Sequence, residues 1–295
     1  MANLKALRVR IESVKSTRKI TSAMKLVSAS KLRRAQIRAE AARPYAERMA
    51  RMLSALAASA AGSPMAPPLL VGTGRDQTHL ILAVTADRGL AGAFNANVGR
   101  AARVLAQQLQ AQGKTVKFGV IGRKGRDFLR RDFADRIAFD VTFAGRKQIE
   151  FADAEAIAAR VRDLLREGAF DVCTLIYNRF VSVISQITTE TQLIPTPVPQ
   201  GEASTTPGAR QAVYDFEPAE EDLLARLLPQ NLAVQIYKAL IESAAGEQGA
   251  RMTAMDNATR NAGDMIGRLT LSYNRTRQAN ITSELIEIIS GAEAL

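Results

Sequence analysis

The sequence has little cysteine, histidine or aromatic content. Its 295 residues include one cysteine, one histidine and no tryptophan, and aromatic residues make up 5%. A lone cysteine excludes an internal disulfide, as is usual in a reducing compartment. A lone histidine with no second histidine or nearby cysteine cannot supply a zinc-ligand set. No Ser/His/Asp or Cys/His pattern for nucleophilic catalysis is recognisable around it either. We therefore expect His79 and Cys173 to be structural residues, and we expect no metal site, no cofactor and no catalytic residues.

Long apolar runs are also missing. The chain has no stretch of about eighteen consecutive apolar residues, so we expect no membrane span and no direct membrane insertion. The first residues, Met1–Lys5, lack the basic-then-apolar order of a secretory signal. Low aromatic content with abundant alanine, leucine, arginine and glutamate is typical of long helices.

Basic residues are concentrated at the N-terminus. Residues 1–51 carry fourteen lysines and arginines against three acids, which accounts for the net charge of +11 of the whole chain. Such a segment could bind nucleic acid through its phosphates. However, Tyr45 is its only aromatic residue, and no zinc-finger or helix-turn-helix pattern accompanies it. A solvated or protein-facing helix is favoured, and a nucleic-acid-binding coiled coil stays open.

Both ends of the chain are predicted to be long helices. Residues 1–62 begin with apolar residues at heptad spacing, after which we expect the apolar stripe to slip by one residue, and Pro44 predicts a kink or a short break. The slipped stripe of this first helix passes through Thr17, Ile20, Met24 and Val27.

In residues 218–295, a short helix is expected to end before Pro229, and a heptad seam then runs from Val234 to Ile286. The two end helices are predicted to pair as an antiparallel coiled coil, provided the chain between them returns to its start.

Residues 75–194 alternate between strand and helix patterns. This alternation predicts a mostly parallel sheet with helices on its faces, a Rossmann-like α/β domain whose last two strands form an antiparallel edge. The expected strands are Thr78–Thr85, Val116–Ile121, Ile137–Phe143, Val172–Tyr177 and Val181–Ile194, and the expected helices are Asn95–Gln112, Lys124–Phe133 and Ile149–Glu167. Met65–Gly74 is predicted to be a linker, and residues 195–217 an exposed loop.

A glycine-bearing turn, Asp87–Asn95, follows the first strand at the place where a dinucleotide fold holds phosphates. Its glycines are Gly89 and Gly92, a spacing that matches neither the dinucleotide fingerprint nor a P-loop. A turn that lets strand and helix pack closely is therefore favoured over a nucleotide site. A stand-alone nucleotide-dependent α/β enzyme with helical arms remains the alternative function.

Sequence motifs at both ends resemble a known family. At the N-terminal end these are IESVKSTRKITSAMKLV (residues 11–27) and SASKLRRAQ (28–36), and at the C-terminal end ARMTAMDNAT (250–259), YNRTRQANITSE (273–284) and SGA (290–292). Together they closely resemble the terminal signatures of the gamma subunit of F-type ATP synthase.

This resemblance implies a central rotor shaft that couples rotation of the membrane ring to conformational change at the catalytic beta subunits and is not itself catalytic. It implies alpha, beta and epsilon subunits and the c-ring as partners, and a peripheral position at the cytoplasmic face of the bacterial inner membrane. Residues matching contact positions of the family are Met24 and Lys25 near the C-terminal region of beta, Arg251 further along the shaft, and Arg277, Gln278, Thr282 and Glu284 at the tip, against loops of beta.

One departure from the family is Gln248-Gly249, where the family more often has His-Ala. Together with Gly246 and Gly263, Gly249 is expected to loosen the last helix by roughly 1 kcal/mol per glycine relative to alanine.

Overall fold

The computed structural model describes residues 4–60, 67–146, 148–197 and 220–293. The chain forms two compact units, one made of residues 1–30 and 251–295 and the other of residues 31–250. Two long helices, α1 (Leu4–Ala60) and α6 (Glu220–Glu293), contribute to both units. The predicted loop at 195–217 lies almost entirely outside the described residues.

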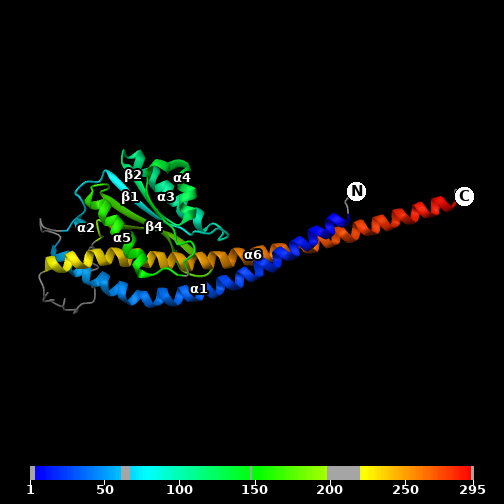
Figure 1. The fold of residues 1–295 in the computed structure, drawn as a ribbon, viewed down its shortest axis with the longest axis horizontal. Helices are drawn as coiled ribbons and strands as arrows, with labels where there is room; N and C mark the ends of the chain where they lie inside the picture. The colour runs from blue at the N-terminus through cyan, green and yellow to red at the C-terminus, as the bar shows by residue number, and fades with distance from the viewer. Residues whose placement is uncertain (1–3, 61–66, 147, 198–219, 294–295) are drawn as a thin grey trace, which may run out of the picture. The chain divides into compact units, whose positions relative to one another are not determined.

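The second unit is built on a five-stranded sheet with the order β3-β2-β1-β4-β5. Strands β1 to β4 are parallel, and β5 runs antiparallel to β4 at the edge (Figure 1). The strands are β1 (Thr78–Val84), β2 (Thr115–Ile121), β3 (Ile137–Val141), β4 (Val172–Phe180) and β5 (Gln186–Ile194). The remaining helices are α2 (Pro68–Val71), α3 (Phe94–Ala111), α4 (Arg123–Phe133), the 3-10 helix η1 (Ala134–Arg136) and α5 (Phe151–Arg166). The predicted Rossmann-like α/β fold is confirmed.

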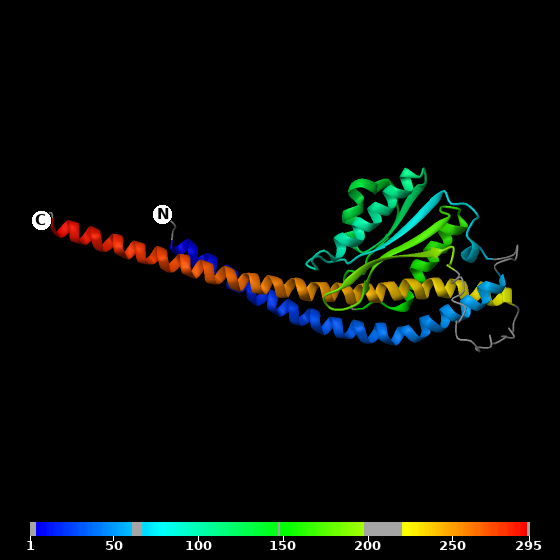
Figure 2. The same cartoon turned by 180° about the vertical axis from the view of Figure 1, so that it is seen from behind.

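Helices cover both faces of this sheet, as Figure 2 shows. In β1, Ile81 and Ala83 pack in a core with α3 and α4, whereas Leu80 and Leu82 pack in a second core with α5 and α6. Six of the seven residues of β1 are consequently buried, which explains why its sequence is a continuous apolar run rather than an alternating one. Cys173 of β4 is fully buried in the second core.

Neither Pro229 nor Pro44 ends a helix. The helix predicted to end before Pro229 is instead the first part of α6, which continues through the proline. Leu228 and Leu232, on either side of it, are 2% and 4% exposed. A proline inside a helix costs about 3 kcal/mol, while burying one leucine side chain contributes roughly 1.5–3 kcal/mol, so packing outweighs the local cost. Likewise α1 continues through Pro44, so the short break predicted there as one alternative is wrong, while the kink stays a prediction.

Two shorter predictions are also corrected. The predicted linker Met65–Gly74 contains helix α2. The strand expected from Val181 begins at Gln186, because Ser182 and Ser185 close a tight turn with backbone hydrogen bonds of 3.0 and 3.2 Å.

Two glycines of α6 lie against the β4–β5 hairpin and the start of α3. A Cβ added at Gly249 would lie 3.1 Å from the carbonyl oxygen of Val183, and one added at Gly246 would lie 3.1 Å from Cε2 of Phe94. Nothing lies within 4 Å of such a Cβ at Gly263. Gly246 and Gly249 therefore permit close packing, so the loosening expected from the sequence is offset there by tertiary contact.

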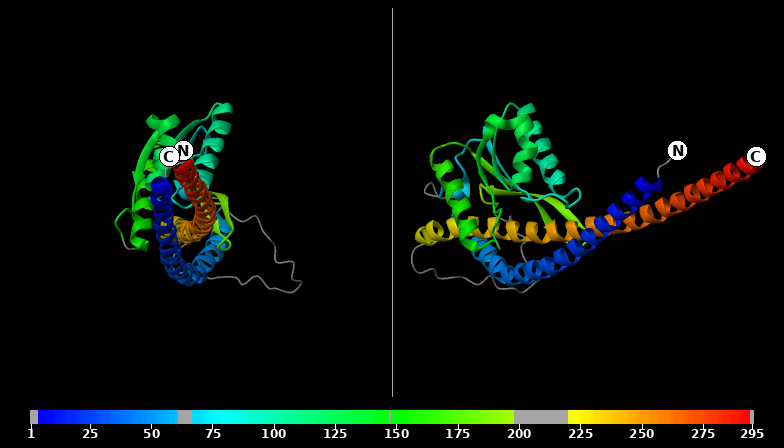
Figure 3. Two further views of the ribbon diagram at one scale, coloured as in Figure 1. Left: turned by 90° about the vertical axis from the view of Figure 1, so that its right-hand side faces the viewer. Right: turned by 45° about the vertical axis from the view of Figure 1, so that its right-hand side comes forward.

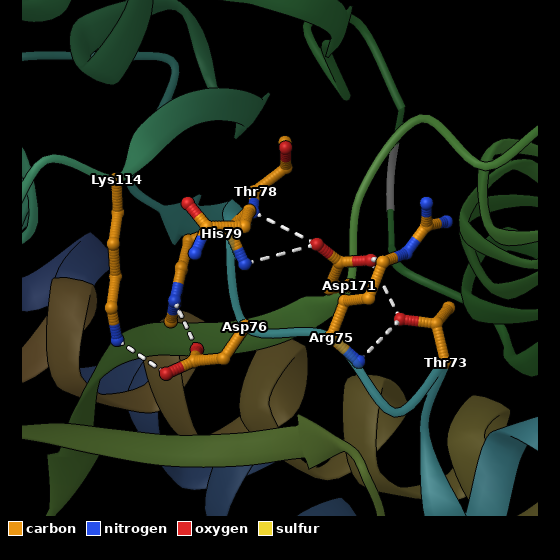
Figure 4. A network of polar contacts seen from close by, with 8 residues as sticks. Thr73, Arg75, Asp76, Thr78, His79, Lys114 and Asp171 are labelled. Carbon is orange, nitrogen blue, oxygen red and sulfur yellow. Dashed lines mark hydrogen bonds and ion pairs between the residues drawn. The ribbon is translucent and has the colours of Figure 1, made fainter.

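A polar network secures the amino ends of the parallel strands (Figure 4). The hydroxyl of Thr73 donates to Oδ1 of Asp171 at 2.6 Å, and the backbone amides of Gln77 and Thr78 donate to Oδ2 at 3.1 and 3.0 Å. Burial would raise the pKa of Asp171, but these hydrogen bonds and the charge of Arg75 outweigh it and hold the pKa below its ordinary value. Asp171 thus ties the segment before β1 to the start of β4.

Beside it, Asp76 joins two further strand ends. Its carboxylate accepts a hydrogen bond from Lys114, which precedes β2, and lies 2.7 Å from Nε2 of His79 in β1. The hydrogen bond from Lys114 is the main cause that lowers the pKa of Asp76. The His79 side chain is 9% exposed, and its contact with this carboxylate links two ends of the chain segment that enters β1.

We expect Asp171→Asn to destabilise the α/β unit by about 1–3 kcal/mol, because an amide nitrogen cannot accept the hydrogen bonds that the carboxylate accepts. The folded-state pKa is lowered, so this stability is present above the unfolded-state pKa of about 4 and is lost as the pH falls through the folded-state value. Urea unfolding from pH 7 to pH 3 should show a shallower loss in the variant than in the wild type. Asp140→Asn, which removes an exposed ion pair with Arg126, is the matched control and should change little. Parallel pH profiles for wild type and Asp171→Asn would contradict the assignment.

The α6 glycines should respond oppositely to alanine. Gly263→Ala should raise the free energy of unfolding by up to about 1 kcal/mol, since its Cβ enters open space and the helix gains propensity. Gly249→Ala should lower it, because the nearest atom is a backbone oxygen that cannot rotate away. Thermal unfolding of the two variants measures the difference, and equal stabilisation by both would show that Gly249 has no packing function.

Candidate functional site

The unit made of residues 1–30 and 251–295 is held by contacts between the two ends of the chain. Nζ of Lys25 lies 2.6 Å from Oδ1 of Asp256, and the hydroxyl of Thr259 donates to that of Thr21 at 2.7 Å. Going from Lys25 to Thr21 leads toward the N-terminus of α1, whereas going from Asp256 to Thr259 leads toward the C-terminus of α6. The two helices are therefore antiparallel, as predicted. The hydrogen bond from Lys25 is the main cause that lowers the pKa of Asp256.

The seam between these segments is more polar than the sequence predicted. The expected slip of the apolar stripe is wrong, since Ile20 and Val27 are 60% and 56% exposed. The heptad spacing of Leu4, Leu7, Ile11 and Val14 instead continues through polar residues: Thr21 is 9% exposed, Ser28 is 2% exposed and Lys25 is half-buried. Small and polar residues keep the register because they meet polar partners, so the apolar side chains at neighbouring positions are left outside.

The last turns of α6 extend beyond the end of α1. Both helices rise about 1.5 Å per residue, so the contacts at Lys25 and Thr21 place Leu4 opposite about residue 276. Figure 3 shows the C-terminal end of α6 running past the start of α1. Every residue from 281 to 292 is exposed. The large apolar residues among them are Ile281, Leu285, Ile286, Ile288 and Ile289, at 48–67% exposure.

We call residues 277–293 the tip. Four of the predicted site residues lie in it and are exposed: Arg277, Gln278, Thr282 and Glu284. They share the tip with the five apolar residues named above. Of these the sequence analysis named only Ile286, as the end of the heptad seam, where it is instead 58% exposed. Apolar residues on more than one face of the last turns were the available signal, because a helix with no own-chain partner needs no single apolar stripe.

The other predicted site residues lie away from the tip. Met24 and Lys25 are half-buried in the helix pair, and Lys25 is engaged with Asp256. Arg251 is 8% exposed, so little of its side chain is open to a partner. The structure therefore does not bring all seven residues together, and it separates the tip group from these three.

The crevice where a Rossmann-like sheet holds a nucleotide is filled by the chain itself. In an open α/β sheet this crevice lies at the carboxyl ends of the strands where their order reverses, here between β1 and β4. Phe94, the first residue of α3, is 3% exposed and packs with Ala86, Ala91 and Ala250. The side chain that follows the glycine turn is thus buried among these residues, at the helix start where a dinucleotide fold holds a phosphate.

Polar groups around this turn are satisfied within the protein. Asp87 accepts hydrogen bonds from the backbone amides of Arg123 and Phe143 at 2.9 and 2.8 Å and from the hydroxyl of Thr142 at 2.8 Å. The side chain of Asn95 accepts from the amide of Ala86 at 2.8 Å. The turn therefore serves close packing, which disfavours the nucleotide-dependent enzyme.

In the part of the chain that the structure describes, no helix is long and apolar enough to cross a membrane. Across the same residues, no three histidine, cysteine, aspartate or glutamate side chains gather where they could hold a metal ion.

Comparison with known proteins agrees with this architecture over the whole chain. The family described as ATP synthase matches residues 3–295. The chain is 67% identical to the ATP synthase gamma chain of Granulibacter bethesdensis and 66% identical to that of Acidiphilium cryptum, with 100% of each chain covered in both cases. It belongs to the ATP synthase gamma chain family.

Solved structures of ATP synthases contain chains that share its fold. The central stalk and c-ring structure of the Tetrahymena thermophila mitochondrial ATP synthase contains a chain that is 28% identical, with a TM-score of 0.60 over 81% of this chain and 99% of that one. A chain of the Euglena gracilis mitochondrial ATP synthase is 19% identical and shows the same fold, with a TM-score of 0.67 over 99% of this chain and 94% of that one.

An unpaired tip in a gamma-family chain should be visible in hydrogen exchange. In the isolated chain we expect amides of residues 281–292 to exchange at least about a hundredfold faster than those of residues 232–245, because a single exposed helix end frays while the latter segment is packed in the core. Mass spectrometry of exchanged peptides measures this. Equal protection of both segments in the isolated chain would show that the tip packs on this chain.

Proposed function

We propose that this chain is the central rotor shaft of an F-type ATP synthase and couples rotation of the membrane ring to conformational change at the catalytic beta subunits. The observation that carries the proposal is the antiparallel pairing of the two chain ends, continued by an exposed apolar tip, in a chain that matches gamma chains over its full length. A lone helix end with five exposed large apolar residues suits enclosure by a partner.

The mechanism follows from unequal contact. A shaft inside a hexamer of three alpha and three beta subunits touches each beta subunit with a different side at a given angle. Rotation of the shaft can shift the nucleotide affinity of a catalytic site only if the shaft interacts differently with the alternative conformations of that site. Identical contact with all three sites would not couple rotation to nucleotide affinity. The chemistry then belongs to beta, and this chain is not itself catalytic. Its filled crevice at Phe94 supports that division.

Within this mechanism the tip residues have two tasks. Leu285 and the four exposed isoleucines around it face an apolar socket formed by the hexamer. Arg277, Gln278, Thr282 and Glu284 contact loops of beta. Exposed polar and charged contacts of this kind are individually weak, so they can form and break as the shaft turns.

The positions on the helix pair contribute differently. We propose that Met24 and Lys25 lie near the C-terminal region of beta, with Lys25 oriented by Asp256. Arg251 acts mainly within the shaft, in keeping with its burial. The epsilon subunit and the c-ring are the partners proposed for the α/β unit, and the assembled chain would be peripheral at the cytoplasmic face of the bacterial inner membrane, without bound nucleic acid.

A reversible crosslink tests the proposal. In a complex reconstituted with alpha and beta subunits, Gln278→Cys paired with a cysteine in a facing beta loop should stop ATP turnover on oxidation, and reduction should restore it. The native Cys173 is fully buried, and burial raises its thiol pKa, so it should not compete. Arg130→Cys, at an exposed position of α4, is the control and should leave turnover unchanged when oxidised.

Two results would count against the proposal. Undiminished turnover in a fully crosslinked complex would show that the tip does not need to move relative to beta. Nucleotide turnover by the purified chain alone would support the stand-alone enzyme instead.

A further inference from the structure

A groove of about 400 Å³ opens within the unit of residues 31–250, between α1, the segment joining β3 to α5, and α6. Four cationic residues line it: Lys31, Arg34 and Arg38 from α1 and Arg146 from the β3–α5 segment. Glu247 of α6 is the one acid among the described residues that line it. The groove is therefore strongly cationic for its size.

The α1 cations share one face of the helix, because their spacing of three and four residues repeats with the helical turn. Arg146 is paired with Asp153, and Arg38 donates to the amide oxygen of Gln148, a neutral partner. Among the ion pairs of the described residues, none includes Lys31 or Arg38. Lys31 and Arg38 thus face the groove without an ion pair to a carboxylate, and the lining cations outnumber its one carboxylate, Glu247, which favours a bound anion.

The rest of the lining is mostly apolar. Ala35, Phe143, Ile149, Ile241 and Ala244 complete the groove together with Gln148 and Gln248. Known ligand pockets of about 300–1,000 Å³ combine such apolar walls with a few charged groups that orient the ligand. The complementary molecule carries an anionic group at one end and a compact apolar part at the other. Arginine favours phosphate because its planar N–H groups match two phosphate oxygens at once.

We propose that this groove binds a small organic phosphate, with the phosphate held by Lys31 and Arg38 and the apolar part resting against Phe143 and Ile241. None of the seven residues assigned above to subunit contacts lines it. A phosphate ester beside an apolar group occurs both in soluble phosphomonoesters and in the headgroup region of phospholipids.

Phenyl phosphate is the probe for the purified full-length chain, titrated by calorimetry at about 0.15 M salt to screen non-specific attraction. We expect saturable binding with one site per chain, and roughly tenfold weaker binding of inorganic phosphate, which cannot use the apolar wall. Arg38→Gln should weaken phenyl phosphate binding about tenfold through the lost charge-assisted hydrogen bonds. Ala35→Leu should weaken it as well by filling the groove without changing its charge.

Arg130→Gln is the matched control, because it removes one exposed positive charge from α4, which does not line the groove. Its affinity for phenyl phosphate should equal that of the wild type. Circular dichroism and thermal unfolding establish that all three variants are folded, and the two α1 substitutions act by independent means, charge and volume.

A second arm separates the two sources of phosphate. Flotation with phosphatidylglycerol vesicles that is lost in Arg38→Gln and Ala35→Leu but kept in Arg130→Gln identifies a lipid headgroup as the ligand. Saturable phenyl phosphate binding without flotation identifies a soluble phosphomonoester. The proposal is overturned if neither probe binds, if inorganic phosphate binds as tightly as phenyl phosphate, or if Arg130→Gln weakens binding as much as Arg38→Gln.

Discussion

The structure depends on contact between residues more than 230 positions apart in the sequence. Lys25 meets Asp256 across 231 residues, and Thr21 meets Thr259 across 238. Helices of 57 and 74 residues cannot bury their lengths against one sheet, and isolated helices in water are held only weakly by their own hydrogen bonds. Each end therefore needs the other as a neighbour, and the intervening chain must fold so that it comes back. An α/β unit with its own two cores meets that requirement.

The chemistry of the pairing is unusual for a coiled coil. Thr21, Ser28 and Lys25 occupy seam positions where leucine or isoleucine would give more apolar burial. The Lys25–Asp256 pair is partly exposed on both sides, and such pairs add little stability. What they add is register, because a slipped alignment would lose these partners. A shaft that transmits rotation needs a fixed alignment of its two strands more than it needs a deep apolar seam.

Sequence reasoning succeeded where one physical signal dominated. Strand β1 was predicted as Thr78–Thr85 and is observed as Thr78–Val84, and the helix predicted as Lys124–Phe133 is α4, because buried strands and amphipathic helices leave clear patterns. It failed at Pro229, where packing of Leu228 and Leu232 outweighs a local rule that is correct for an unsupported helix. The turn at Asp87–Asn95 was favoured as a packing device because of its glycine spacing, and Phe94 at its end does pack with Ala86 and Ala91.

The candidate site was harder to predict than the fold. The apolar stripe was expected to slip at Thr17, since Ile20 and Val27 are the more hydrophobic residues, yet both lie outside the pair. A single sequence cannot show that Thr21 will find a threonine partner 238 positions away. The cationic groove could not be predicted for the same reason. In the sequence, Lys31 and Arg38 resemble a solvated helix face, and only the fold places Phe143 and Ile241 from distant segments beside them.

The exposed apolar residues of the two regions have different physical causes. In the helix pair, Ile20 and Val27 lie outside the seam because polar contacts occupy it, whereas in the tip Leu285 and Ile289 are exposed because no other helix of the described residues reaches them. Single exposed apolar side chains are ordinary on protein surfaces, but five within nine residues on an unaccompanied helix end form a continuous apolar surface. Since α6 continues without interruption into this end, its apolar surface is presented on an extension of the same helix that Asp256 and Thr259 hold in register. The paired region thus sets the orientation, and the tip provides the surface on which a surrounding partner can act.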